Sequence, residues 1–233
     1  MMDFNRDSFI NGKLLLINKP VGWTSFQVVN KIRWLIKSSF DIKKIKVGHA
    51  GTLDPLAEGL LIVCTGKLTK KIAEFQNTKK EYSGTFYIGA TTPSFDLETP
   101  INSKCSIKSI NAEKLNLTSK EFLGAIKQTP PVFSAIKVKG KKLYEYARKG
   151  EAIQLKKREV YIYKFKITNI NLPLVNFEII CSKGTYIRSI ANDFGKELKT
   201  GAYLHKLIRT SIGDFKLDDA LTIENFEKKI KSG

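Results

Sequence analysis

Short apolar runs and alternating segments follow one another along the chain and predict several strands. Residues 13–17 and 60–64 are apolar runs of strand length, and the second of them follows a glycine-rich turn. Residues 175–181 place an apolar side chain at every second position, which is typical of a strand with one buried face. Residues 82–89 alternate in a similar way and predict another strand.

Helical spacing predicts helices between these strands. Thr24 or Ser25 is placed to cap a helix on which Val28, Ile32 and Leu35 share one face. A second helix is expected after the turn at Gly184 and Thr185, and its apolar side holds Ile187, Ile190, Ala191 and Phe194.

Two further segments are predicted to contain helices. Residues 67–75 predict a helix, and Thr118 with Glu121 has capping-box spacing, so a helix is expected to begin there. Pro130 and Pro131 would end that helix, and residues 132–138 are expected to be extended.

Together these elements predict an α+β fold with a mixed, mainly antiparallel sheet flanked by helices. The chain of 233 residues is long enough for a sizeable core, and it contains no repeat or low-complexity linker. We therefore expect a single domain over residues 1–233, with a short terminal helix in residues 216–233.

The net charge of the chain indicates a class of binding partner. The chain has 40 Lys and Arg against 22 Asp and Glu, a formal net charge of +18, which favours a polyanion such as RNA or an anionic membrane. Residues 137–158 hold nine basic and two acidic residues, interleaved with Leu143, Tyr144 and Tyr146. This segment is interpreted as a basic arm, and a solvated lysine-rich helix explains the same window equally well.

Several classes of protein lack their signals here. No apolar run approaches the roughly 20 residues that a membrane span needs, and the polar N-terminus does not resemble a signal peptide. Cys64, Cys105 and Cys181 are widely separated and are interpreted as reduced thiols of a cytosolic protein. With two histidines and no CxxC motif, a zinc site is not expected, and neither a P-loop, a GxGxxG nor a GxSxG motif is present.

The candidate chemistry centres on Asp54, in the glycine-rich segment 48–59. An Asp before a proline is more often a turn residue or N-cap than a catalyst. A carboxylate in an apolar cleft needs a cation to stay ionised, however, and the guanidinium of Arg188 suits that task.

Seven motifs follow one another along about residues 13–215. They are KPVGWTS (19–25), GHAGTLDPLA (48–57), KEY (80–82), QTPPVFSAIK (128–137), GKKLYEYAR (140–148), CSKGTYIRSI (181–190) and LIR (207–209). In these motifs and in their order, the chain resembles the TruB family of bacterial tRNA pseudouridine synthases.

The resemblance implies a pseudouridine-synthase fold and a role for each matching residue. Asp54 is at the position of the catalytic aspartate, and Arg188 at that of the arginine that pairs with it. Tyr82 matches the tyrosine that stacks on the target base, and Leu207 an apolar residue of the same pocket.

The remaining matches concern RNA and the support of the catalytic loop. His49 corresponds to a histidine that contacts the tRNA T-loop, while Lys19 and Pro20 correspond to a motif that supports the catalytic loop. Residues 137–158 correspond to an RNA-clamping insert. The residues expected to bind RNA are Lys137, Lys139, Lys141, Lys142, Arg148, Lys149 and Arg209.

The implied activity is isomerisation of the T-loop uridine at position 55 of tRNA, by a cytoplasmic monomer that needs no cofactor or metal. Two alternatives stay open: a tRNA-folding chaperone with secondary catalysis, and a guide-RNA-directed synthase. The chain departs from the family pattern at Pro93 and Ile208, and a full C-terminal PUA domain is not expected.

Overall fold

The computed structural model describes residues 4–134, 137–138, 141–143, 146 and 155–231. The chain forms two compact units. The first unit is Met1–Tyr82 with Leu207–Gly233, and the second unit is Ser83–Lys206. Strands β4 (Lys80–Ile88) and β12 (Ala202–Ile212) each contribute residues to both units.

The first unit is organised around β3 (Glu58–Thr65). This strand pairs antiparallel with β1 (Leu14–Lys19) and β2 (Val47–His49), and parallel with the end of β12. Strand β13 (Phe215–Lys216) pairs with β12. Because β3 is covered on both faces, its sequence is a continuous apolar run, as predicted for a buried strand.

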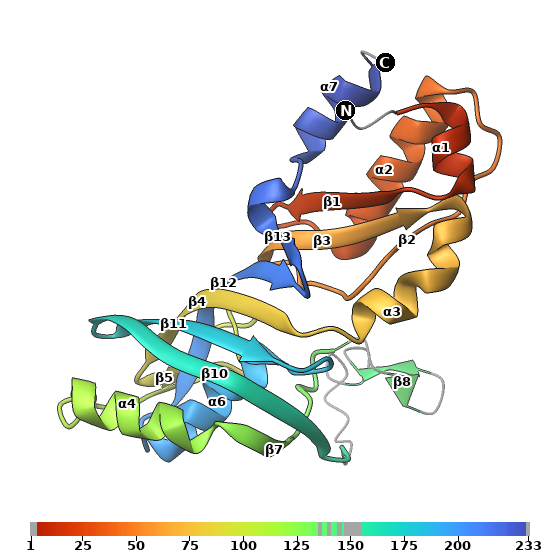
Figure 1. Cartoon of the computed structure of the whole chain (residues 1–233). Helices are drawn as coiled ribbons and strands as arrows, with labels where there is room; N and C mark the ends of the chain where they lie inside the picture. Colours follow the sequence, from red (N-terminus) through yellow and green to blue (C-terminus); the bar gives the residue numbers. More distant parts are fainter. Residues whose placement is uncertain (1–3, 135–136, 139–140, 144–145, 147–154, 232–233) are drawn as a thin grey trace. The chain divides into compact units, whose positions relative to one another are not determined.

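Helices cover the two faces of this sheet. Helices α1 (Arg6–Asn11), α2 (Ser25–Ser39) and α7 (Ile223–Lys231) pack against one face, where Leu61 and Val63 contribute from β3 (Figure 1). Alternate β3 residues, Leu60 and Ile62, lie in a second cluster with side chains of η1 (Gly66–Lys71) and α3 (Ile72–Gln76). The helix predicted over residues 67–75 is therefore present as two consecutive helical pieces.

Helix α2 begins as the sequence predicts. The N-cap is Thr24, whose Oγ1 accepts from the Gln27 backbone N–H at 3.1 Å, while Gln27 Oε1 accepts from the Thr24 N–H at 2.7 Å. This reciprocal capping box satisfies two backbone donors of the first turn. The hydroxyl of the next residue, Ser25, is consequently available for a contact outside the helix.

The second unit has the strand order β12-β4-β11-β10-β7, with β7 (Gly124–Gln128), β10 (Arg158–Asn171) and β11 (Leu174–Cys181). The β10–β11 and β10–β7 pairs are antiparallel. Helices α4 (Ala112–Glu121) and α6 (Ile187–Glu197) pack on this sheet (Figure 1). A cluster of aromatic rings joins the helices and strands of this unit. The rings belong to Phe86, Phe122, Phe165, Phe177 and Phe194.

Two of the predicted elements of this unit are confirmed and one is wrong. The alternating strand β11 and the amphipathic helix α6 lie where the pattern placed them. The helix expected to begin at Thr118 instead begins after Asn111, whose Oδ1 accepts from the Lys114 N–H at 2.8 Å, and ends at Glu121. Gly124 has a φ of 90°, which favours glycine, and it starts β7 in the stretch that had been expected to be helical.

The segment after the two prolines is only partly extended. Residues 132–134 form bends, and Lys137–Val138 form β8, which pairs with β9 (Lys141–Lys142). Short elements complete the described chain: β5 (Ala90–Thr91) with β6 (Ser103–Lys104), and η2 (Leu217–Asp219). The mixed sheet with flanking helices confirms the predicted α+β class.

Candidate active site

Asp54 lies in a loop of the first unit between β2 and β3. The loop turns at Gly51, whose φ of 98° favours glycine, and ends where the Ala57 N–H donates to the Asp54 carbonyl at 3.1 Å. The side chain of Asp54 is half-buried. We call residues 51–55 the Asp54 loop.

Three side chains outside the Asp54 loop bind its backbone. Arg209 donates from Nη2 to the Gly51 carbonyl at 3.0 Å. The Ser25 hydroxyl donates to the Leu53 carbonyl at 3.0 Å and accepts from the Leu53 N–H at 2.9 Å. Lys19 lies within 3.4 Å of the Pro55 carbonyl. The backbone is thus bound before Asp54, next to it and after it.

Lys19 is a buried cation whose ammonium group is surrounded by carbonyl oxygens. Its Nζ donates to the Trp23 carbonyl at 2.6 Å and to the Pro20 carbonyl at 2.9 Å, in addition to its contact with Pro55. Burial lowers the pKa of Lys19 to about 8, while the charge of Asp54 acts in the opposite direction. Pro20 itself is half-buried.

His49 ends β2 and is half-buried. Burial lowers its pKa, the charge of Arg209 lowers it further, and a hydrogen bond with the Gly51 backbone opposes both. Among the described residues, no hydrogen-bond partner is found for its buried Nδ1 atom. Burial and the charge of Arg209 therefore both favour the uncharged form of this imidazole.

Two further candidates are buried in the strands that run through both units. Tyr82 lies on β4 with 8% of its surface exposed, and Leu207 lies on β12 with 7% exposed. Both belong to the first unit, together with Asp54.

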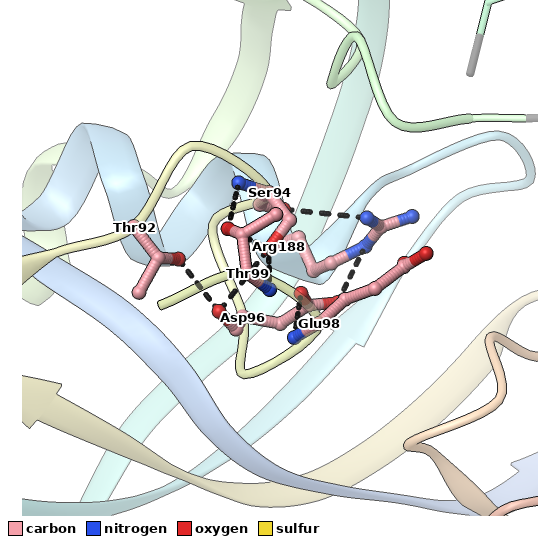
Figure 2. A network of polar contacts seen from close by, with 6 residues as sticks. All are labelled: Thr92, Ser94, Asp96, Glu98, Thr99 and Arg188. Carbon is pink, nitrogen blue, oxygen red and sulfur yellow. Dashed lines mark hydrogen bonds and ion pairs between the residues drawn. The ribbon is translucent and has the colours of Figure 1, made fainter. Parts of the chain in front are cut away.

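Arg188 lies in the second unit, in the first turn of α6. Its Nε is 3.5 Å from Asp96 Oδ2, and its Nη1 donates to the Ser94 carbonyl at 3.3 Å (Figure 2). Both charged side chains are almost completely buried. Asp54 and Arg188 belong to different units, so their pairing stays a prediction.

The segment that carries Asp96 is braced internally. Thr92 Oγ1 donates to the Asp96 carbonyl at 2.6 Å, and Asp96 Oδ1 accepts from the Glu98 N–H at 3.0 Å. The hydroxyl groups of Ser94 and Thr99 are 2.8 Å apart (Figure 2). We call residues 92–99 the Asp96 loop. The family resemblance matches Asp96 to a later acid of the family, but no role was predicted for it from the sequence.

The expected RNA-binding residues divide into three groups. Lys137, Lys141 and Lys142 lie on the small β8–β9 hairpin. Lys139, Arg148 and Lys149 lie outside the described residues. Arg209 is only 1% exposed, and its guanidinium binds backbone carbonyls.

A cationic feature that the sequence did not indicate lies in the first unit. A cavity of about 260 Å³ is lined by apolar and basic side chains close to the start of β2. Its basic lining residues are Lys44, Lys46, Lys67 and Lys70.

The three cysteines form no disulfide. Cys64 and Cys181 are buried, Cys105 is exposed, and burial raises the pKa of Cys64 to about 11. Within the described part of the chain, no cluster of His, Cys, Asp or Glu is arranged to hold a metal ion. No helix there has the length and apolar character to cross a membrane.

Comparison with known proteins identifies the class. The family model described as TruB family pseudouridylate synthase (N terminal domain) matches residues 37–187. A curated relative from Flavobacterium johnsoniae, named tRNA pseudouridine synthase B, is 53% identical over 97% of this chain and 99% of its own length. A relative of the same name from Phocaeicola vulgatus is 51% identical over 94% of this chain and 93% of its own length. The chain belongs to the TruB family of pseudouridylate synthases.

Solved structures agree with this assignment at the level of the fold. The crystal structure of a Cbf5-Nop10-Gar1 complex contains a chain that is 27% identical, with a TM-score of 0.70 over 94% of this chain. A structure of an H/ACA RNP bound to a substrate RNA containing 2′-deoxyuridine gives 25% identity and a TM-score of 0.68. This chain spans about half the length of both, at 54%. Together with the family match, these similarities confirm the predicted pseudouridine-synthase fold.

Proposed function

We propose that this chain converts the T-loop uridine at position 55 of tRNA to pseudouridine, with Asp54 as the catalytic residue. The observation that carries the proposal is the near-complete coverage of relatives named tRNA pseudouridine synthase B at about half identity. The Asp54 loop supports it, because its backbone is bound on both sides of one half-buried acid.

The reaction is an isomerisation. The C1′–N1 bond breaks, the uracil turns over, a C1′–C5 bond forms, and the hydrogen lost from C5 is balanced by one gained at N1. No redox equivalent or group donor is consumed. Asp54 would act as the nucleophile toward the ribose or the uracil ring, or as the base that removes a sugar proton.

The other candidates would complete the pocket in the proposed enzyme. Arg188 would pair with Asp54 and favour its ionised form, as the family resemblance implies, and its own position is fixed by the buried ion pair with Asp96. Tyr82 offers an aromatic face for the flipped base, and Leu207 an apolar surface that retains the detached uracil.

Recognition of tRNA would rest on charge and on base flipping. A uridine inside a structured loop is extruded before chemistry can reach it, and His49 would contact the loop that it leaves. The net charge of +18, the lysines of the β8–β9 hairpin and the lysine-lined cavity supply attraction for phosphates. We further propose that the enzyme acts in the cytoplasm as a monomer.

The test uses the purified chain and a T-arm hairpin without guide RNA. Pseudouridine measured by nucleoside chromatography is expected for the wild type and for Asp7→Asn, a matched change at an exposed acid of α1. Asp54→Asn is expected to bind the hairpin and form none. Pseudouridine formation by Asp54→Asn would remove that residue from the chemistry.

The same experiment, extended by a tRNA-refolding assay, separates the two alternatives. For a chaperone with secondary catalysis, the wild type and Asp54→Asn would refold tRNA equally well, and the wild type would form little pseudouridine. A guide-RNA-directed synthase, which the similarity to structures of H/ACA complexes brings into consideration, would leave the isolated hairpin unmodified.

A further inference from the structure

We propose that Arg209 and Ser25 are positioning residues that fix the Asp54 loop for catalysis, and that Arg209 does not contact RNA phosphate. The proposal rests on the proposed catalytic role of Asp54. Its basis is a set of hydrogen bonds from two distant elements, β12 and the start of α2, to the backbone that flanks this acid.

Arg209 is one of the largest fully buried side chains of the described structure. Its Nε donates to the Leu60 carbonyl at 2.8 Å, and its Nη2 donates to the Gly51 carbonyl at 3.0 Å. One rigid guanidinium therefore ties the strand that leaves the Asp54 loop to the turn that enters it. A lysine ammonium lacks this planar arrangement of separated donors.

The backbone around Arg209 is shaped for this contact. On β3, Gly59 is the parallel partner of Arg209 and has a φ of 109°. A Cβ at Gly59 would lie 2.4 Å from the Arg209 carbonyl oxygen, so a side chain there would force the strands apart. Gly51 has a φ of 98°, and a Cβ added there would lie 3.6 Å from Arg209 Nη1. Glycine at position 59 thus allows the close approach of β3 and β12 at Arg209, whereas at position 51 the positive φ favours glycine and a Cβ would only make ordinary van der Waals contact with the guanidinium.

Ser25 binds the residue directly before Asp54. Because Thr24 makes the capping box of α2, the Ser25 hydroxyl is available to donate to the Leu53 carbonyl and accept from the Leu53 N–H. Ser25 is 2% exposed. The two hydrogen bonds of this one buried hydroxyl hold the peptide groups on both sides of Leu53, and the second of these groups joins Leu53 to Asp54.

Burial argues against a phosphate contact for Arg209. A side chain that neutralises a phosphate must present its charge to the RNA, whereas 1% of Arg209 is exposed and its donors are directed to carbonyls inside the first unit. Arg209 therefore acts on the site through the backbone of the Asp54 loop.

The experiment compares Arg209→Lys and Ser25→Ala with wild type on the T-arm hairpin. Matched controls are Arg6→Lys in α1 and Ser38→Ala in α2, the same changes at exposed positions. Single-turnover rates, the Kd for the hairpin and the salt dependence of that Kd are measured. A misplacement of about 1 Å lowers a rate by up to about 100-fold, so we expect losses of roughly 10- to 100-fold for both variants. The Kd and its salt slope should stay at the wild-type values.

A phosphate contact gives the opposite pattern. Arg209→Lys would then keep the single-turnover rate at saturating RNA, and Arg209→Met would weaken binding and reduce the salt slope by about 1. That result would overturn the proposal for Arg209. A wild-type single-turnover rate for Ser25→Ala would overturn the proposal for Ser25. If the Arg209 variants do not fold, the rate of Ser25→Ala alone tests whether side-chain contacts position the Asp54 loop.

The outcome for the proposed function is separate. If the wild type leaves the hairpin unmodified, the activity itself is wrong. If the wild type is active, Asp54→Asn is inactive, and both Arg209→Lys and Ser25→Ala react at the wild-type rate, only the positioning proposal fails.

Discussion

The Asp54 loop and the Asp96 loop belong to different units, and most of the contacts that hold them are of different kinds. Side chains from outside bind the backbone of the Asp54 loop, and two of them, Lys19 and Arg209, are buried cations. The Asp96 loop is braced mainly by its own hydroxyl and carboxylate groups, and one cation from outside, Arg188, faces its acid and donates to the Ser94 carbonyl.

This difference indicates what each loop depends on. The Asp54 loop should be sensitive to any change that removes a hydrogen-bond donor from its carbonyls, because side chains outside the loop fix its position. The Asp96 loop should keep its shape more easily, but it should not tolerate loss of the charge that balances Arg188. We therefore predict that substitutions displace the Asp54 loop, whereas substitution of Asp96 leaves the charge of Arg188 uncompensated.

The largest effect is expected for Asp96→Ala. Removing one partner of a buried ion pair leaves the other charge unbalanced, so we expect the free energy of unfolding to fall by about 3–5 kcal/mol. Urea denaturation measures it. The matched change Asp193→Ala removes a surface pair with Lys196 and should cost less than about 1 kcal/mol. Equal losses for the two variants would contradict the charge-balance role of Asp96.

A smaller effect is expected for Lys19→Met. The carbonyls of Pro20 and Trp23 lose a donor, at a cost of about 1–3 kcal/mol, partly offset because a buried charge is removed. Lys37→Met, an exposed change on α2, is the control.

The pH dependence of the Lys19 variant gives a second measurement. The pKa of Lys19 is about 8 in the folded chain against an ordinary 10.5, so the unfolded chain binds more protons between these values. The contribution of Lys19 to wild-type stability therefore rises as the pH increases from about 8 to 10.5. Lys19→Met should lack this rise, and an unchanged pH profile would show that the ammonium is not buried in solution.

Thr24→Ala tests whether Thr24 caps α2 while Ser25 binds the Asp54 loop. Loss of the N-cap should lower the free energy of unfolding by about 1 kcal/mol. If Thr24 caps the helix while Ser25 serves the loop, the single-turnover rate of Thr24→Ala should change far less than that of Ser25→Ala. Wild-type stability of the Thr24→Ala variant would show that the capping box does not stabilise α2.

The smallest expected effect is electrostatic. The charge of Arg209 contributes to the lowered pKa of His49, so Arg209→Met should raise that pKa toward its ordinary 6.5. The chain has two histidines, and NMR titration of their ring signals separates them. His49 is uncharged in the folded chain above its lowered pKa, so its stabilising contribution is present above pH 6.5 and is lost as the pH falls. In Arg209→Met the pKa of His49 lies closer to 6.5, so the stability that His49 contributes is lost over a narrower pH range.

Much of the fold followed from short-range patterns. The apolar run of β3, the alternation of β11 and the cap of α2 are all set by neighbouring residues. The capping-box spacing at Thr118 misled because Asn111 is the cap that the chain uses and Gly124 redirects the following residues into a strand. Spacing alone does not show which of two competing caps begins a helix.

The candidate site was less accessible to the sequence. A family resemblance pointed to Asp54 and Arg188, but the contacts of Ser25 and Arg209 are made with backbone carbonyls far along the chain. Every residue has a backbone carbonyl, so the sequence does not indicate which carbonyls accept hydrogen bonds from side chains. The sequence shows the charge of Arg209, while the direction of its side chain depends on the pairing of β12 with β3.

The distribution of thiols has a practical consequence for labelling. The burial and raised pKa of Cys64 keep that thiol protonated near neutral pH, and Cys181 is also buried. Cys105 is exposed in the second unit, so a maleimide fluorophore should attach there without removal of the other two cysteines. The natural chain thus offers a single attachment point for following RNA association by fluorescence.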